Sequence, residues 1–87
     1  MKTKYSFELM ELDGGIVAVP VGKGAEKFRG VLKVNETAAE ILKLLEKDTN
    51  ESIIVNKLQK DYSGNRDEIA GFVHDYVQKL IEEGIVE

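Results

Sequence analysis

The chain changes from strand to helix within the stretch Gly30-Val31-Leu32-Lys33-Val34-Asn35-Glu36-Thr37-Ala38-Ala39-Glu40-Ile41. Leu32 and Val34 are two residues apart and share one face of a strand, and the β-former Val31 precedes them. Asn35 then stands where a helix N-cap is expected, because its side-chain oxygen can accept from an amide of the first turn. Glu36 places a negative charge at the positive end of the helix. The stretch therefore predicts a strand that runs directly into a helix.

Two further strands are expected before this stretch. Residues 5–12 begin with apolar and polar residues in alternation, and the alternation fails at Met10, which indicates either a bulge or a change of environment. Asp13-Gly14-Gly15 predicts a tight turn, and residues 16–21 form the returning strand. Pro20 lacks an amide donor, so it is expected near a strand end or at a sheet edge.

Three helices are expected after it, over residues 36–47, 50–62 and 66–83. Thr49 is the expected N-cap of the second helix. Asn65 and Glu68 have the spacing of a capping box at the start of the third.

The third helix has the widest apolar stripe in the chain, made by Ile69, Phe72, Val73, Tyr76, Val77, Leu80 and Ile81. A helix that packs on one neighbour needs a narrower stripe, so this helix is expected to make contacts on two sides. Gly84 is expected to end it in a left-handed C-cap, with Ile85 making the accompanying hydrophobic contact.

The predicted order is three strands followed by three helices, in one domain that spans residues 1–87. The fold class is α+β: a three-stranded antiparallel sheet followed by three helices. The short turn between the second and third helices is typical of a helix-turn-helix unit, so the fold is expected to be winged-helix-like.

Composition limits the functions that the chain can have. There is no cysteine, which removes disulfides, thiolate zinc sites and cysteine nucleophiles. No apolar run is long enough for a membrane span, and the N-terminus lacks the apolar core of a signal peptide, so a cytoplasmic protein is expected.

Charge is unevenly distributed along the chain. Residues 1–34 have six Lys/Arg against four Asp/Glu, a net charge of +2, whereas residues 35–87 have six against twelve, a net charge of −6. The basic excess concentrates at Lys23, Lys27, Arg29 and Lys33. An acidic helical half is a poor match for a phosphate backbone, whereas a basic strand would attract an acidic peptide.

No catalytic or metal site is indicated. His74 is the single histidine and falls outside the apolar stripe, and a lone histidine does not make a metal site. The pairs Asp67-Glu68 and Glu82-Glu83 stand at helix ends, where capping and dipole effects explain them. We therefore expect no enzymatic activity, no metal and no cofactor.

Three features favour a peptide-binding function. Strand 30–34 can leave its backbone groups unpaired for an added strand, the stripe of the third helix can supply an apolar floor, and Lys27, Arg29 and Lys33 place positive charge nearby. The alternative is that the stripe is entirely core and that the lysines protect a sheet edge from aggregation.

The stretch Gly30–Ile41 resembles the leucine-asparagine-glutamate-threonine-alanine signature of the PqqD-like family. Residues Ile69 to Val86, with the glycine at position 84, are similar to the last helix of that family and its capped end, and Pro20 and Gly22 stand at its proline-glycine turn. Val34 replaces the usual leucine. Phe72 replaces a frequently acidic residue, which removes the expectation of a polar peptide contact there.

The resemblance implies a recognition element for RiPPs, which are ribosomally made and post-translationally modified peptides. Such domains bind the leader region of a precursor peptide as an added antiparallel strand, between the third strand and the third helix. They present it to a modifying enzyme, often a radical SAM protein, in natural product biosynthesis. By position, the implied peptide-binding residues are Arg29, Gly30, Val31, Leu32, Lys33, Val34, Phe72, Val73, Tyr76 and Lys79.

Other interpretations remain at this point. A winged-helix DNA-binding regulator would need a basic third helix, which this chain lacks. An accessory protein without a leader partner is the third hypothesis. The open strand edge is compatible with a monomer or with a strand-swapped dimer.

Overall fold

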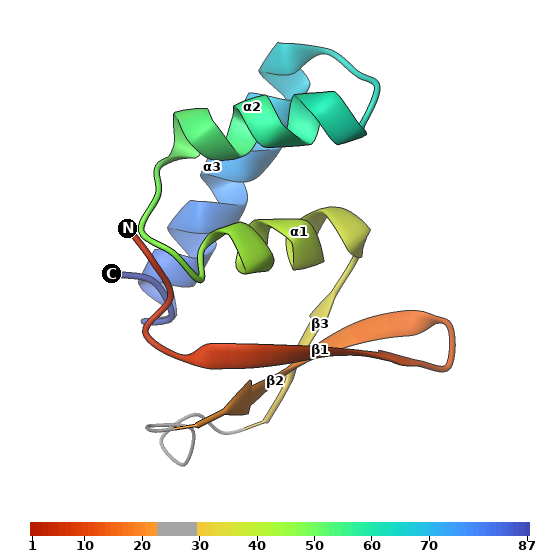
Figure 1. The fold of residues 1–87 in the computed structure, drawn as a ribbon, viewed down its shortest axis with the longest axis vertical. Coiled ribbons are helices and arrows are strands. Elements are labelled where there is room, and N and C mark those ends of the chain that lie inside the picture. The colour runs from red at the N-terminus through yellow and green to blue at the C-terminus, as the bar shows by residue number, and fades with distance from the viewer. Residues whose placement is uncertain (23–29) are drawn as a thin grey trace.

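The computed structural model of the chain describes residues 1–22 and 30–87. Its elements follow the predicted order (Figure 1): β1 (Ser6–Leu12), β2 (Gly15–Val21), β3 (Leu32–Val34), α1 (Glu36–Leu44), α2 (Glu51–Asp61) and α3 (Arg66–Glu82). The predicted α+β class, with three antiparallel strands followed by three helices, is confirmed. Lys23, Lys27 and Arg29, which the sequence placed in a basic segment, lie outside the described residues.

The β1–β2 hairpin is regular along its whole length. Its register is unbroken from Ser6 opposite Val21 to Leu12 opposite Gly15, and the two turn residues Asp13 and Gly14 have φ of 47° and 78°. Two positive φ values match the right-handed twist of the strands, as in a type I′ turn. The loss of alternation at Met10 is therefore not a bulge.

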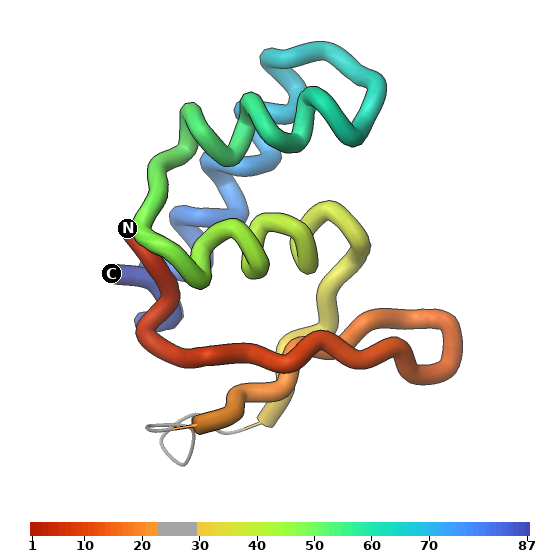
Figure 2. The backbone as a smooth tube through the Cα atoms, viewed as in Figure 1, coloured from red at the N-terminus to blue at the C-terminus, as the bar shows by residue number. Residues whose placement is uncertain are grey.

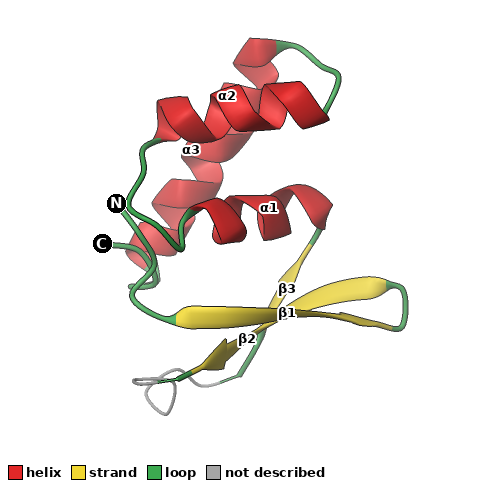
Figure 3. Ribbon diagram, in the orientation of Figure 1, coloured by secondary structure: helices red, strands yellow, loops and turns green. Residues whose placement is uncertain are grey.

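The distal end of this hairpin extends past the helices (Figure 3), where little covers it. Met10 is 44% exposed and Leu12 is 55% exposed. A change of environment is thus the correct explanation of the failed alternation.

The third strand is shorter than predicted. The sequence indicated a strand over Gly30–Val34, whereas the ladder joins only Leu32–Val34 of β3 to Ala18, Val17 and Ile16 of β2. Gly30 has a φ of 92°, a left-handed conformation that an extended strand cannot contain. Pro20 lies one residue from the end of β2, beyond the stretch that pairs with β3, as its missing amide requires.

The helices all lie on one side of the sheet. Figure 1 shows α1 next to the sheet, α2 beyond α1, and α3 behind both. Ala18 on the central strand is fully buried and belongs to the same core cluster as Ile41 and Leu45 of the helical layer. Leu32 and Val34 pack against this core from β3. The inner face of the sheet is thereby fixed to the helical layer.

Asparagine side chains cap the helices. Asn35 Oδ1 accepts from the Ala38 amide at 2.8 Å, as predicted. The second helix is capped by Asn50, whose Oδ1 accepts from the Ile53 amide at 3.0 Å, and not by Thr49 as the sequence suggested. The Thr49 amide instead donates to the Met1 carbonyl at 2.9 Å, which holds the residue outside the helix.

The third helix has the predicted ends, with one difference. Asn65 Oδ1 accepts from the Asp67 amide at 2.7 Å, one position earlier than a capping box with Glu68 requires. At the other end Gly84 has a φ of 75°, its amide donates to Ile81 at 3.0 Å, and the Ile85 amide donates to Leu80 at 2.8 Å. These two bonds form a Schellman motif, which directs Ile85 into the core.

The two ends of the chain lie together (Figure 2) because residues near them pair across a short bridge. Thr3 pairs with Val86, and the Lys4 amide donates to the Ile85 carbonyl at 2.7 Å. The Thr3 amide also donates to the Leu45 carbonyl at 3.0 Å. That contact lies where α1 ends, at Leu44 rather than at residue 47 as predicted.

We predict that Gly84→Ala destabilises the fold by about 1–2 kcal/mol, the cost of a left-handed conformation in a residue with a Cβ. No atom lies within 4 Å of the Cβ that would be added, so the effect is one of backbone strain alone. Urea unfolding followed by circular dichroism measures the change.

Gly71→Ala is the matched control for this prediction. Gly71 lies inside α3, and an added Cβ there also meets no atom within 4 Å. This variant should be more stable by about 0.5–1 kcal/mol, because alanine favours a helix interior. Equal effects of the two substitutions would contradict the assigned C-cap.

Candidate functional site

The edge of β3 is open within the described part of the chain. The sheet order is β1-β2-β3, so β3 pairs with β2 on one side and with no described strand on the other. Leu32 and Val34 are half-buried against the core, and Lys33 between them is exposed on the opposite face of the sheet. A strand anchored in this way presents fixed backbone donors and acceptors to an added strand.

The apolar stripe of α3 divides into two faces. Val73, Val77 and Leu80 are buried in the core. Beside them, Phe72 is 39% exposed and Tyr76 is half-buried, and their rings stack with centroids 6.1 Å apart and planes inclined by 9°. The helix therefore has both a core face and a partly exposed aromatic face, which explains why its stripe is so wide.

Tyr76 is a half-buried phenol on this aromatic face. Burial raises the pKa of Tyr76 above its ordinary value, because the ionised phenolate is poorly solvated there, and the nearby Glu83 carboxylate raises it further. The side chain is consequently a neutral aromatic group with a polar tip throughout the physiological range.

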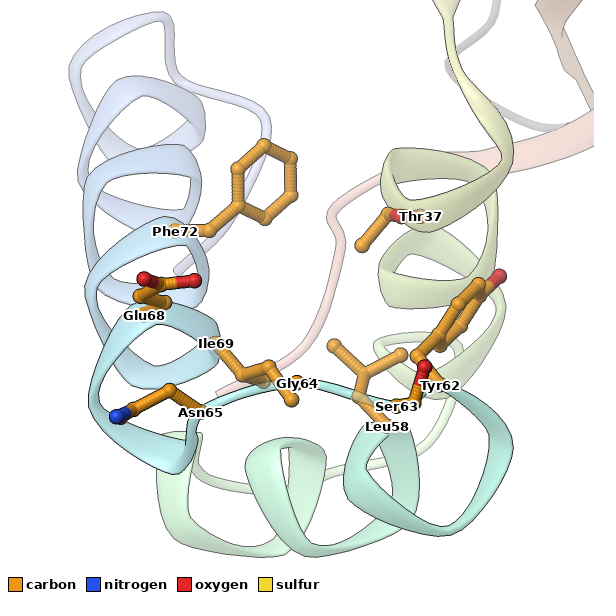
Figure 4. A pocket seen from close by; sticks show the side chains of 9 residues that line it. All are labelled: Thr37, Leu58, Tyr62, Ser63, Gly64, Asn65, Glu68, Ile69 and Phe72. Atoms are coloured by element: carbon orange, nitrogen blue, oxygen red, sulfur yellow. The ribbon is translucent and has the colours of Figure 1, made fainter.

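A hollow of about 280 Å³ lies between the starts of α1 and α3 and the end of α2. Figure 4 shows Phe72 extending from α3 across this hollow toward Thr37 in the first turn of α1. Thr37 follows the last residue of β3 by three positions, so one wall of the hollow lies three residues along the chain from the end of that strand. The remaining lining residues are Leu58, Tyr62, Ser63, Gly64, Asn65, Glu68 and Ile69.

Arg29 lies outside the described residues, and the implied peptide-binding residues outside β3 that the structure describes fall into three environments. Phe72 and Tyr76 form the aromatic face, and exposed Lys79 follows them near the end of α3. Val31 is 51% exposed, and it lies with Gly30 just before the ladder of β3. The structure contradicts the implied role of Val73. Its side chain is fully buried in the core and has no exposed surface that could contact a peptide.

Apart from Phe72, the residues of the hollow have no functional role in the sequence analysis. Ile69 appears there only in the apolar stripe of the third helix, and Thr37 only in the stretch that resembles the family signature. Ile69 precedes Phe72 by three positions on α3, so helical spacing indicated a shared face. Nothing in the sequence indicated that Thr37 and Leu58 would line the same space.

The charges of α3 do not suit a nucleic acid. The helix carries Arg66 and Lys79 against four acidic residues. The Arg66 guanidinium is also held by α2, since it donates to Asn56 at 2.8 Å and to Gln59 at 2.6 Å. A recognition helix in a DNA groove needs free cations on its outer face.

Polar groups that could support other functions are sparse over residues 1–22 and 30–87. No group of three metal-ligating side chains occurs there. His74 Nδ1 lies 3.0 Å from Glu51 Oε1, which links α3 to the first turn of α2 at the surface. In the same described ranges, no helix is both long enough and apolar enough to cross a membrane.

We predict that alkaline titration, followed by tyrosinate absorbance, resolves a late phase that is absent from Tyr76→Phe and from the urea-unfolded chain. Glu83→Gln should move that phase to lower pH, because it removes a negative charge near the phenol. The folded-state pKa of Tyr76 lies above the ordinary value of 10.0. The contribution of the protonated phenol to the free energy of unfolding is therefore fully present below that pH. It is lost as the pH rises through the folded-state value.

The chain resembles known proteins in both sequence and fold. The family model described as "Coenzyme PQQ synthesis protein D (PqqD)" matches residues 10–86. No curated protein matches the sequence.

Two solved structures share the fold. "TbiB1 in Complex with the TbiA(beta) Leader Peptide" has a TM-score of 0.71 and 20% identity, over 100% of this chain and 95% of the other. "Lasso peptide synthetase B1 complexed with the leader peptide" has a TM-score of 0.66 and 20% identity, over 97% of this chain and 93% of the other. Since the family model spans nearly all of the chain, this protein belongs to the PqqD family.

Proposed function

We propose that this protein is a recognition element for a ribosomal precursor peptide. It binds the leader region as an added antiparallel strand on β3 and presents the peptide to a modifying enzyme, which we take to be of the radical SAM type from the family resemblance. The observation that carries the proposal is the edge of β3 that faces away from β2, which has no strand partner among the described residues.

Backbone pairing on β3 supplies the first part of the binding energy. The position of β3 is set before the peptide binds. Leu32 and Val34 pack against the core, and the edge of β3 that faces β2 is already paired. A preformed edge of this kind reduces the ordering cost of binding, which falls mainly on the peptide.

The aromatic pair on α3 supplies the second part. An added strand directs alternate side chains toward the helical layer, where Phe72 and Tyr76 offer a partly exposed apolar surface. Two apolar anchors together with strand pairing are typical of complexes with free energies on the order of −8 to −12 kcal/mol. The PqqD-like family frequently has an acidic residue at this position. Phe72 would therefore make an apolar contact with the peptide in place of a polar one.

The remaining alternate side chains of the peptide would lie on the outer face of the sheet, which also carries Lys33. A cation beside the added strand favours acidic residues at these outward positions. The protein thereby combines sequence-tolerant backbone pairing with a preference for an acidic and apolar pattern of period two.

The two similar structures both contain leader peptides, which supports this choice over a DNA-binding function. The test uses synthetic leader segments of candidate ribosomal precursor peptides. Titration into isotope-labelled protein should shift the amide signals of Leu32–Val34, Phe72 and Tyr76, and leave the outer face of α2 unaffected. Saturation without any shift in β3 would refute the proposed site.

We predict that methylation of single backbone amides in the bound leader weakens binding at every second residue only. In an antiparallel ladder, alternate residues direct their amides to the partner strand and the others direct them away. Calorimetry should give losses of about tenfold or more at the affected positions, the effect of roughly 1.4 kcal/mol per lost bond. A helical ligand would instead lose affinity along a continuous run.

We predict that Lys33→Glu weakens the binding of an acidic leader by about 2- to 10-fold at low salt, the scale of an exposed charge pair. The fold should be unchanged, because Lys33 is exposed. Added salt should reduce the difference between variant and wild type.

Lys57→Glu on the exposed side of α2 makes the same charge change away from β3 and serves as the control. If both variants lose the same affinity, the effect belongs to net charge, and the specific role of Lys33 is refuted.

A further inference from the structure

We propose that the outer face of the sheet, on the side away from the helices, is a surface by which two copies of this chain associate. The association does not depend on the proposed function, because the outer face and the aromatic face of α3 lie on opposite sides of the sheet. The expected assembly is a weak, symmetric dimer in which sheet packs on sheet.

The strand register separates the two faces of the sheet. Ala18 is buried in the core, and Leu9 and Leu32, which lie beside it on β1 and β3, pack against that core. Residues that alternate with these three point the other way. The outward positions are Ser6, Glu8, Met10, Leu12, Gly15, Val17, Val19, Val21 and Lys33. Figure 3 shows the described helices on the inner side of the sheet only.

Apolar side chains occupy most of the outer face. Met10 is 44% exposed, Leu12 is 55% exposed and Val21 is 37% exposed. Val17 and Val19 on the central strand are half-buried, yet in the described chain they belong neither to the core nor to the residues packed against it. A contiguous apolar surface of this kind is typical of an interaction site.

The two charged residues of the outer face stand on its opposite edge strands. Met10, Val17 and Lys33 form one row across all three strands, and Glu8 on β1 stands one row away, opposite Val19. Neither Glu8 nor Lys33 has an ion-pair partner among the described residues. Because one edge carries a negative group and the other a positive group, the face is complementary to a second copy of itself.

A two-fold axis along β2 brings these charges together. Rotation about this axis lays β2 over β2 of the second copy, and β1 over its β3. Glu8 of each copy then stands one row, roughly 6.8 Å, from Lys33 of the other, and two long side chains span this offset between sheets that stack roughly 10 Å apart. Such a contact is isologous, so the dimer contains the charge pair twice and the assembly is closed.

The small size of the face predicts that the dimer is weak. Seven residues per long strand and three strands cover about 340 Å², at roughly 3.4 Å per residue and 4.8 Å per strand. A standard stable interface buries about 800 Å² per partner. We therefore expect a dissociation constant on the order of 100 µM, and a monomer in dilute solution.

Sedimentation velocity of the full chain, from about 10 µM to about 1 mM, tests the association. The wild type should pass from monomer to dimer within this range. Met10→Lys should raise the dissociation constant at least about tenfold, because the symmetric dimer buries this side chain twice. Leu12→Lys should act in the same way and serves as a second variant, and circular dichroism shows that each variant is folded.

Ile53→Lys is the matched control for the apolar contact. Ile53 lies on α2, is 43% exposed and undergoes the same chemical change as Met10, but it is remote from the sheet. This variant should dimerise like the wild type. A wild type that stays monomeric up to about 1 mM would overturn the proposal, as would equal effects of Met10→Lys and Ile53→Lys.

Charge exchange tests the orientation of the two copies. Glu8→Lys and Lys33→Glu should each weaken self-association about tenfold at low salt, because each creates two like-charge contacts in the symmetric dimer. An equimolar mixture of the two variants should associate as well as the wild type, since every contact again joins opposite charges. The double variant Glu8→Lys/Lys33→Glu should likewise recover self-association. A mixture no stronger than its components would refute the arrangement of β1 over β3, and neither result bears on leader binding.

Discussion

The strand β3 is held on two sides and open on the third, and the rest of the site depends on this constraint. Its inner side chains, Leu32 and Val34, pack against the core, and its ladder with β2 fixes its register in the sheet. The groups that point away from β2 are then rigid but without a strand partner among the described residues. A backbone edge that is ordered before binding is what strand addition requires.

An open edge is also a hazard, and the structure limits it. The ladder of β3 is three residues long, Gly30 has a left-handed conformation two residues before it, and exposed Lys33 is its central residue. Short length and an outward lysine are two of the devices by which proteins discourage unwanted edge pairing. The sequence left two interpretations of the lysines, as peptide contacts or as edge protection, and the geometry lets one residue do both.

In the proposed function, the aromatic face of α3 would give the edge its selectivity. Backbone pairing recognises any extended chain, whereas the partly exposed surface of Phe72 and Tyr76 would favour apolar over polar side chains at alternate positions. The separation of α3 into a core face and a partly exposed aromatic face depends on the complete burial of Val73, Val77 and Leu80 in the interior. Because these three residues fill the interior, Phe72 remains partly exposed although it belongs to the apolar stripe of the helix.

The sequence alone determined the element order, the hairpin turn, the N-caps at Asn35 and Asn65 and the glycine cap at Gly84, because each of these depends on residues within one turn of one another. It erred at Thr49 and over the length of the third strand, where contacts with the N-terminal segment and the conformation of Gly30 decided the outcome. It also could not assign Val73 to the core rather than the groove, since helical spacing gives the stripe but not its neighbours. Tertiary structure alone brought Thr37, Leu58, Tyr62 and Phe72 around one hollow, because those residues come from three helices whose packing no local pattern encodes.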